Sequence, residues 1–114
     1  MPSYRLRIEF EEIGSGILYS SLQSISETLS TGMMTKTAAN GTSDVALSMG
    51  TVTNAEVFLI TANRALSWRL NAADTAITLQ ANRLHVLWGA NQTAPLISNT
   101  SGGTATIRYI CAGT

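Results

Sequence analysis

Hydrophobic and polar side chains alternate along most of this chain with the two-residue spacing that is typical of β-strands. The plainest case is residues 4–11, in which charged side chains alternate with Tyr4, Leu6, Ile8 and Phe10. Charge along an exposed strand opposes pairing with other chains, so we expect an edge strand with a solvated charged face. An alternative interpretation is that these charges form a salt-bridging contact surface for a partner.

The segment at residues 55–70 is expected to lie at the centre of the fold. Its first half is apolar on both pleat faces, which is typical of a strand covered on both sides. Its second half places Leu66, Trp68 and Leu70 on one face, which indicates a half-buried strand. Because Asn tolerates the backbone conformation of a tight turn, the intervening Asn63-Arg64 pair predicts that the two halves form a central hairpin.

Residues 18–29 fit two patterns. Their hydrophobic positions follow a helical stripe, but they also fit two strand phases with a break between them. The many Ser and Thr side chains compete with a helix for backbone hydrogen bonds, which favours a strand paired in a hairpin with residues 4–11. Residues 32–43 have the least regular pattern, and Asn40-Gly41 predicts a turn within them.

Turn signals recur about every 8–12 residues from Gly32 onward, which is typical of antiparallel sandwiches and barrels. We therefore predict an all-β fold, an antiparallel β-sandwich that is jelly-roll-like, with eight or nine short strands. The 114 residues are expected to form one domain, with an N-terminal hairpin at about 4–30 and the main sandwich at about 44–112. Four side chains of the last strand are predicted to face inward: Ala105, Ile107, Tyr109 and Cys111.

The composition changes the expectation about partners. Charged residues make up 12% of the chain, about half of the usual ~25%, and the formal net charge is zero. Ser and Thr together account for 27 residues, so hydroxyl groups supply much of the polarity. A neutral, lightly charged surface promotes association, which favours a protein that works in contact with other proteins. A monomer made soluble by its hydroxyl and amide groups is the alternative.

Several partners are not indicated. There is no basic surplus for nucleic acid, no apolar run of ~18 residues for a membrane, and no apolar signal-peptide core at the N-terminus. Synthesis in a cytoplasm is therefore expected. The three Asn-x-Ser/Thr triplets, which begin at Asn40, Asn91 and Asn99, are interpreted as chance matches in a chain rich in Ser and Thr.

The candidate chemistry is sparse. His85 and Cys111 are the single histidine and cysteine, and no spacing supports a nucleophilic site around them. No ligand-spaced set of His, Cys, Asp or Glu predicts a metal site. We expect no catalytic, cofactor-binding or metal-binding residues, and therefore no enzyme.

Aromatic and charged side chains are the candidate binding groups. Trp68 and Trp88 lie in phase with Leu or Val, which favours packing in the core over a sugar-binding platform. Arg64 at the predicted turn and Arg69 beside Trp68 are more exposed positions. The candidate interface residues are Arg5, Arg7, Glu9, Arg64 and Arg69.

From Leu47 onward the order of strands and turns resembles the small all-β virion proteins of tailed bacteriophages. The resemblance covers about two thirds of the chain and includes neither the N-terminal hairpin nor residues 32–43. The segments that carry it are residues 47–53, 57–61, 68–70, 77–79, 84–89 and 97–102.

The resemblance implies a structural role in a virion, most simply as a capsid decoration or cement protein. It implies contacts with the major capsid protein or other virion proteins and a homo-oligomer, with a trimer favoured. A tail-associated module that binds a receptor or a glycan is the alternative function. No individual site residue follows from the resemblance.

Overall fold

The computed structural model describes residues 4–25, 29–69, 71 and 74–114, and its regular elements are all β-strands. The all-β prediction is confirmed, with more strands than expected. The described residues form eleven strands: β1 (Tyr4–Glu12), β2 (Gly16–Ile25), β3 (Leu29–Ser30), β4 (Met34–Ala38), β5 (Thr42–Ala46), β6 (Ala55–Ala62), β7 (Leu66–Arg69), β8 (Ile77–Leu79), β9 (His85–Gln92), β10 (Leu96–Asn99) and β11 (Ala105–Gly113).

Two antiparallel sheets form a β-sandwich. The first has the order β3-β11-β6-β9, with β4 also paired to β11, and the second has the order β5-β10-β7-β8. Strands β3 and β4 extend the sandwich back to Leu29, well before the predicted start near residue 44. The jelly-roll connectivity stays a prediction.

The core between the sheets is built from alternating side chains of both. From β6 and β11 come Phe58, Ile60 and Tyr109, and from the second sheet comes Trp68, which is 1% exposed. The ring centroids of Phe58 and Trp68 are 5.4 Å apart, and those of Phe58 and Tyr109 are 5.7 Å apart. The predicted core position of Trp68 is therefore confirmed; the prediction for the side chain of Trp88 lies outside the described residues. The predicted inward positions in β11 are also confirmed: Ala105, Ile107, Tyr109 and Cys111.

The predicted central hairpin at residues 55–70 is wrong, although both of its strands exist. Strand β6 lies between β11 and β9, whereas β7 lies between β10 and β8 in the other sheet. Asn63 does not turn β6 back on itself, because its backbone N–H donates to the carbonyl of Thr106 (3.2 Å) and its Oδ1 accepts from the N–H of Thr106 (2.8 Å). Asn63 thus extends the pairing with β11 and leads the chain across to the second sheet.

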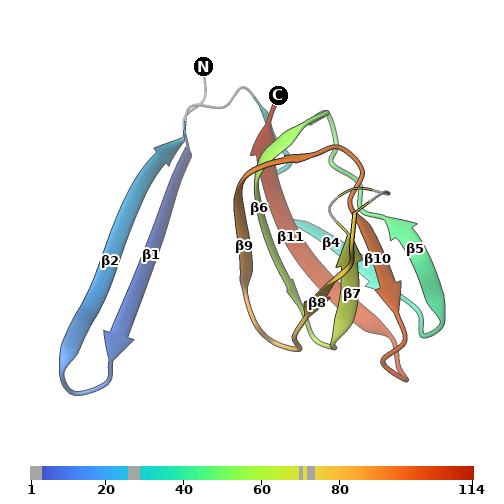
Figure 1. Ribbon diagram of the computed structural model, residues 1–114, viewed down its shortest axis with the longest axis horizontal. Helices are drawn as coiled ribbons and strands as arrows, with labels where there is room; N and C mark the ends of the chain where they lie inside the picture. Colours follow the sequence, from blue (N-terminus) through green and yellow to red (C-terminus); the bar gives the residue numbers. More distant parts are fainter. Residues whose placement is uncertain (1–3, 26–28, 70, 72–73) are drawn as a thin grey trace.

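The N-terminal strands form a hairpin that stands apart from the sandwich (Figure 1). Residues 16–25 are a strand, which confirms the favoured interpretation over a helix. Strands β1 and β2 pair only with each other among the described strands. The radius of gyration is 15.0 Å, against about 13 Å for a compact domain of this length. Strand β1 is therefore an edge strand with an exposed charged face, as expected, and it belongs to this two-stranded hairpin.

Residues 32–43 are more regular than predicted. They include β4 and the start of β5, joined by the expected turn at Asn40-Gly41, where Gly41 has a φ of 87°. Asn99 anchors the neighbouring turn. Its side-chain Nδ2 donates to the carbonyls of Ala38 (2.8 Å) and Gly103 (2.9 Å), and its Oδ1 accepts from the N–H of Ser101 (3.0 Å). Asn99 is fully buried, so the Asn-x-Ser/Thr triplet that begins at Asn99 has a structural role in the folded chain.

We predict that Asn99→Ala lowers the free energy of unfolding by about 2–4 kcal/mol, because it leaves buried backbone groups without partners. Asn40→Ala is the matched control, since exposed Asn40 accepts one hydrogen bond, from Gly102 N–H (2.9 Å). It should cost less than about 1 kcal/mol. Urea unfolding followed by tryptophan fluorescence measures both, and equal losses would contradict this role for Asn99.

Candidate interaction surface

The β1–β2 hairpin, residues 4–25 and hereafter the arm, exposes large hydrophobic side chains. Phe10 is 64% exposed and Ile13, at the tip, is 97% exposed. Phe10 pairs with Tyr19 across the arm, so two aromatic side chains share one face. A two-stranded hairpin has no second layer to cover such side chains and is at best marginally stable in water. The exposed large hydrophobics of the arm are Ile8, Phe10, Ile13, Ile17, Tyr19 and Leu22.

The arm stands opposite the outer face of the first sheet, which is the face turned away from the core. Because side chains alternate along a strand, the burial of Ile60 and Cys111 in the core turns their neighbours outward. The outer face therefore carries Val57, Leu59 and Thr61 of β6, with Arg108, Ile110 and Ala112 of β11. It is predominantly apolar, with one exposed positive charge.

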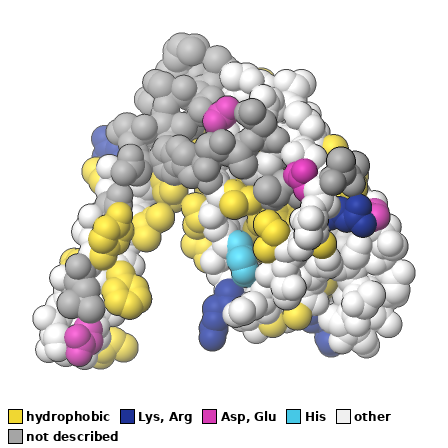
Figure 2. All heavy atoms as spheres, viewed as in Figure 1, with side chains coloured by type: hydrophobic (Ala, Val, Ile, Leu, Met, Phe, Trp, Pro, Cys, Tyr) yellow, Lys and Arg dark blue, Asp and Glu magenta, His cyan; other side chains and the backbone are white. Residues whose placement is uncertain are grey.

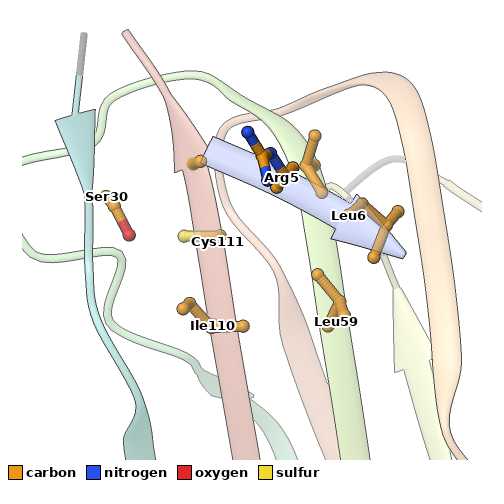
Figure 3. Close-up of a pocket in the computed structure, with 8 residues that line it drawn as sticks. Arg5, Leu6, Ser30, Leu59, Ile110 and Cys111 are labelled. Carbon is orange, nitrogen blue, oxygen red and sulfur yellow. The ribbon is translucent and has the colours of Figure 1, made fainter. Parts of the chain in front are cut away.

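The root of the arm contacts this outer face. Arg5 and Leu6 line a pocket of about 250 Å³ whose other wall includes Leu59 and Ile110 (Figure 3). Val57 also lines it and is only 3% exposed, although it lies outside the core cluster. The root is therefore seated on the sheet, while the rest of the arm projects.

Beyond its root the arm leaves a hollow between itself and the outer face. Figure 2 shows hydrophobic side chains along the arm on the side facing the sandwich, and others on the facing flank. A second pocket, of about 280 Å³, lies on the outer face and is lined by Met33, Leu59, Leu84 and Arg108, among others. Met33 and Leu84 are 69% and 60% exposed. Both walls of the hollow are thus apolar and open to solvent.

Charge is separated between the arm and the outer face. The arm carries Glu9, Glu11 and Glu12 toward its tip, whereas Arg108 lies on the outer face. Figure 2 shows acidic side chains at the free end of the arm and basic ones at the same end of the sandwich. Two ion pairs are present among the described residues, Arg7–Glu9 (2.5 Å) and Arg69–Asp44 (3.6 Å). Neither joins the arm to the sandwich.

The five interface residues predicted from sequence fall in three places. Arg5, Arg7 and Glu9 lie together in the arm, and Arg5 lines the pocket at its root. Arg64 lies in the β6–β7 connection against Gly103, where an added Cβ would collide with its guanidinium group. Arg69 lies on β7 of the second sheet, paired with Asp44. The structure therefore brings the first three together and leaves the other two elsewhere.

The apolar part of this surface was not predicted. Alternation predicts that only the charged face of residues 4–11 is solvated, yet Ile8 and Phe10 on the other face are also exposed because the arm projects from the sandwich. A signal was available near the tip, where Ile13 and Ile17 flank the turn residues Gly14 and Gly16. Large aliphatic side chains beside a tight turn have little core to reach, so they indicate contact with another molecule.

Cys111 and His85 do not form a nucleophilic pair. Cys111 lies on β11 opposite Phe58, and His85 lies on β9 opposite Ile60. They are therefore separated by two strand spacings across the sheet, about 9–10 Å, and by a further two residues along it. Burial raises the pKa of the Cys111 thiol, which keeps it neutral and weakly nucleophilic. Burial also raises the pKa of Tyr109, whose hydroxyl donates to the carbonyl of Ser48 (2.7 Å).

Within the described residues, no group of three or more His, Cys, Asp or Glu side chains is arranged to hold a metal ion. The same part of the chain contains no helix long and apolar enough to cross a membrane. Comparison of the chain with protein-family models, curated proteins and solved structures finds no match.

Because Cys111 and Tyr109 hold their protons more tightly when folded, we predict a loss of stability at alkaline pH. The unfolded chain releases the thiol proton first, so stability is fully present below the unfolded cysteine pKa of ~8.5 and declines above it. Release of each such proton lowers the free energy of unfolding by at most about 1.4 kcal/mol per pH unit. Urea unfolding of the unmodified chain and of Cys111→Ala between pH 7 and 10 measures this effect. The free energy of unfolding of Cys111→Ala should lack the first part of the decline. An identical decline in the two proteins would show that Cys111 is not its cause.

Proposed function

We propose that this chain is a structural protein of a bacteriophage virion, acting as a capsid decoration or cement protein through protein–protein contacts. The observation that carries this proposal is the projecting arm with its exposed apolar side chains. Monomeric proteins rarely leave such a surface uncovered, and an exposed patch of this kind marks a site of association. The low charge and the resemblance to small phage virion proteins support the same function.

A cement protein needs a rigid body and a surface that adheres to neighbouring subunits. The sandwich supplies the body, because Trp68, Phe58 and Tyr109 fill its core without any contribution from the arm. The arm then offers Phe10, Ile13 and other large side chains to the major capsid protein or other virion proteins. In this proposal the chain is made in the host cytoplasm and its working location is the virion.

One observation favours the alternative of a tail-associated module that binds a receptor or a glycan. Phe10 and Tyr19 are paired across the arm, and both rings are more than half exposed, as in an aromatic platform for a sugar. Sugar sites also need convergent hydrogen-bonding groups, whereas Ile8 continues the face of these rings with aliphatic surface. Burial of Trp68 removes one platform considered from sequence. Protein contact is therefore the better-supported function.

Binding to phage capsids assembled without this chain tests the proposal. We predict saturable binding in a sedimentation assay, weakened about 100-fold by Phe10→Ser combined with Ile17→Ser, because both side chains lose their apolar contacts. Ile77→Ser is the matched control, since Ile77 is an exposed isoleucine of the second sheet, 39% accessible. It should bind like the unmodified chain.

Absence of binding to capsids or any other part of the particle would refute the structural function. If instead the unmodified chain bound a saccharide array, and Phe10→Ser abolished that binding, the glycan-binding alternative would replace it.

A further inference from the structure

We propose that the hollow is filled by a second copy of this chain, whose arm inserts between the arm and the outer face of the first. The inserted arm would cover Leu59 and Ile110 of the sheet and place its own apolar side chains in the hollow. This inference rests on the proposed function and names the partner that covers the arm in the purified chain, before the arm contacts a capsid.

The positions of the exposed hydrophobic side chains support this occupant. Nine large hydrophobic side chains are exposed among the described residues, and eight of them belong to the arm or flank the outer face. Six belong to the arm, while Met33 and Leu84 flank the outer face, and Ile77 is the exception. The arm side chains alone present on the order of several hundred Å², a substantial part of the ~800 Å² per partner in a standard interface. A contact between the arm of one copy and the outer face of another covers the exposed side chains of the arm together with those that flank the outer face.

Charge complementarity supports the same chain as the occupant. The distal arm carries Glu9, Glu11 and Glu12, while Arg108 lies on the outer face. No described carboxylate is within ion-pair distance of Arg108. An arm inserted from a second copy brings acidic residues toward Arg108, and the formal net charge of zero gives no long-range repulsion between copies.

The chain's own arm is held away from this position. Leu6 at the root is already seated against the sheet beside Leu59 (Figure 3), and from there the arm diverges from the sandwich (Figure 1). A symmetric exchange fills both hollows, because each copy inserts its arm into the hollow of the other copy.

Light scattering on the purified full-length chain gives the first test. We expect a dimer or trimer at micromolar concentration, with dissociation about 100-fold easier in Phe10→Ser combined with Ile17→Ser. Ile77→Ser should leave the oligomer unchanged. Both substitutions are outside the core, and a cooperative melt of each variant verifies folding. A monomer at all concentrations would overturn the inference, even if the chain still bound capsids and so kept its proposed function.

Disulfide trapping identifies the contact itself. In a Cys111→Ala background, chains carrying Glu11→Cys are mixed with chains carrying Arg108→Cys and oxidised with copper phenanthroline. We expect crosslinked heterodimers at least about tenfold faster than with Thr78→Cys, a control on the second sheet, because the inserted arm raises the local thiol concentration.

A chain carrying both Glu11→Cys and Arg108→Cys distinguishes arm exchange between copies from folding of the chain's own arm onto its outer face. Diluted into a large excess of the Cys111→Ala chain, it should yield mainly uncrosslinked protein, since its partners lack cysteine. Rapid formation of a disulfide within one chain would show that the chain's own arm fills the hollow and would overturn the inference.

Discussion

A two-stranded ribbon has two faces and no layer of its own to cover either. Side chains such as Phe10 and Ile17 gain stability only when another surface removes them from water, at about 25 cal/mol per Å² of apolar area. In this chain the sandwich covers only the root of the ribbon, around Val57. The exposed remainder of the arm, and the apolar sheet face opposite it, are therefore the features on which any account of function depends.

The sandwich itself has no such requirement. Its core is continuous from Trp68 through Phe58 to Tyr109, and the buried amide of Asn99 secures the turn before the last strand. This division separates two tasks in one short chain. The sandwich holds the outer face rigid, and the arm presents an adhesive surface at a distance from it, which suits a protein that joins neighbouring subunits.

The sequence predicts the strands better than their partners. Alternation identifies β1, β6 and β11 correctly because a strand's own pleat dictates it. The pairing of β6 with β7 was wrong because a turn signal at Asn63 is local, whereas the hydrogen bonds that Asn63 makes with Thr106 join residues 43 positions apart. Only the folded chain brings these residues together.

The candidate surface was predicted in part and for a different reason. The charges of Arg5, Arg7 and Glu9 indicate the arm as a contact surface, whereas the exposure of its apolar side chains is not predicted. Alternation is the same whether an apolar face packs against its own core or against another molecule. The distinction requires knowing where the strand lies, which is a tertiary property.

The central claim is that the arm is ordered and covered by another copy of the chain. Amide hydrogen exchange measured at about 1 μM and about 100 μM protein tests it directly, because association protects only the residues that it covers or orders. We predict that the amides of β1 and β2 become protected at the higher concentration, while those of β7 and β10 are protected equally at both. Arm amides whose exchange does not depend on concentration would contradict the account.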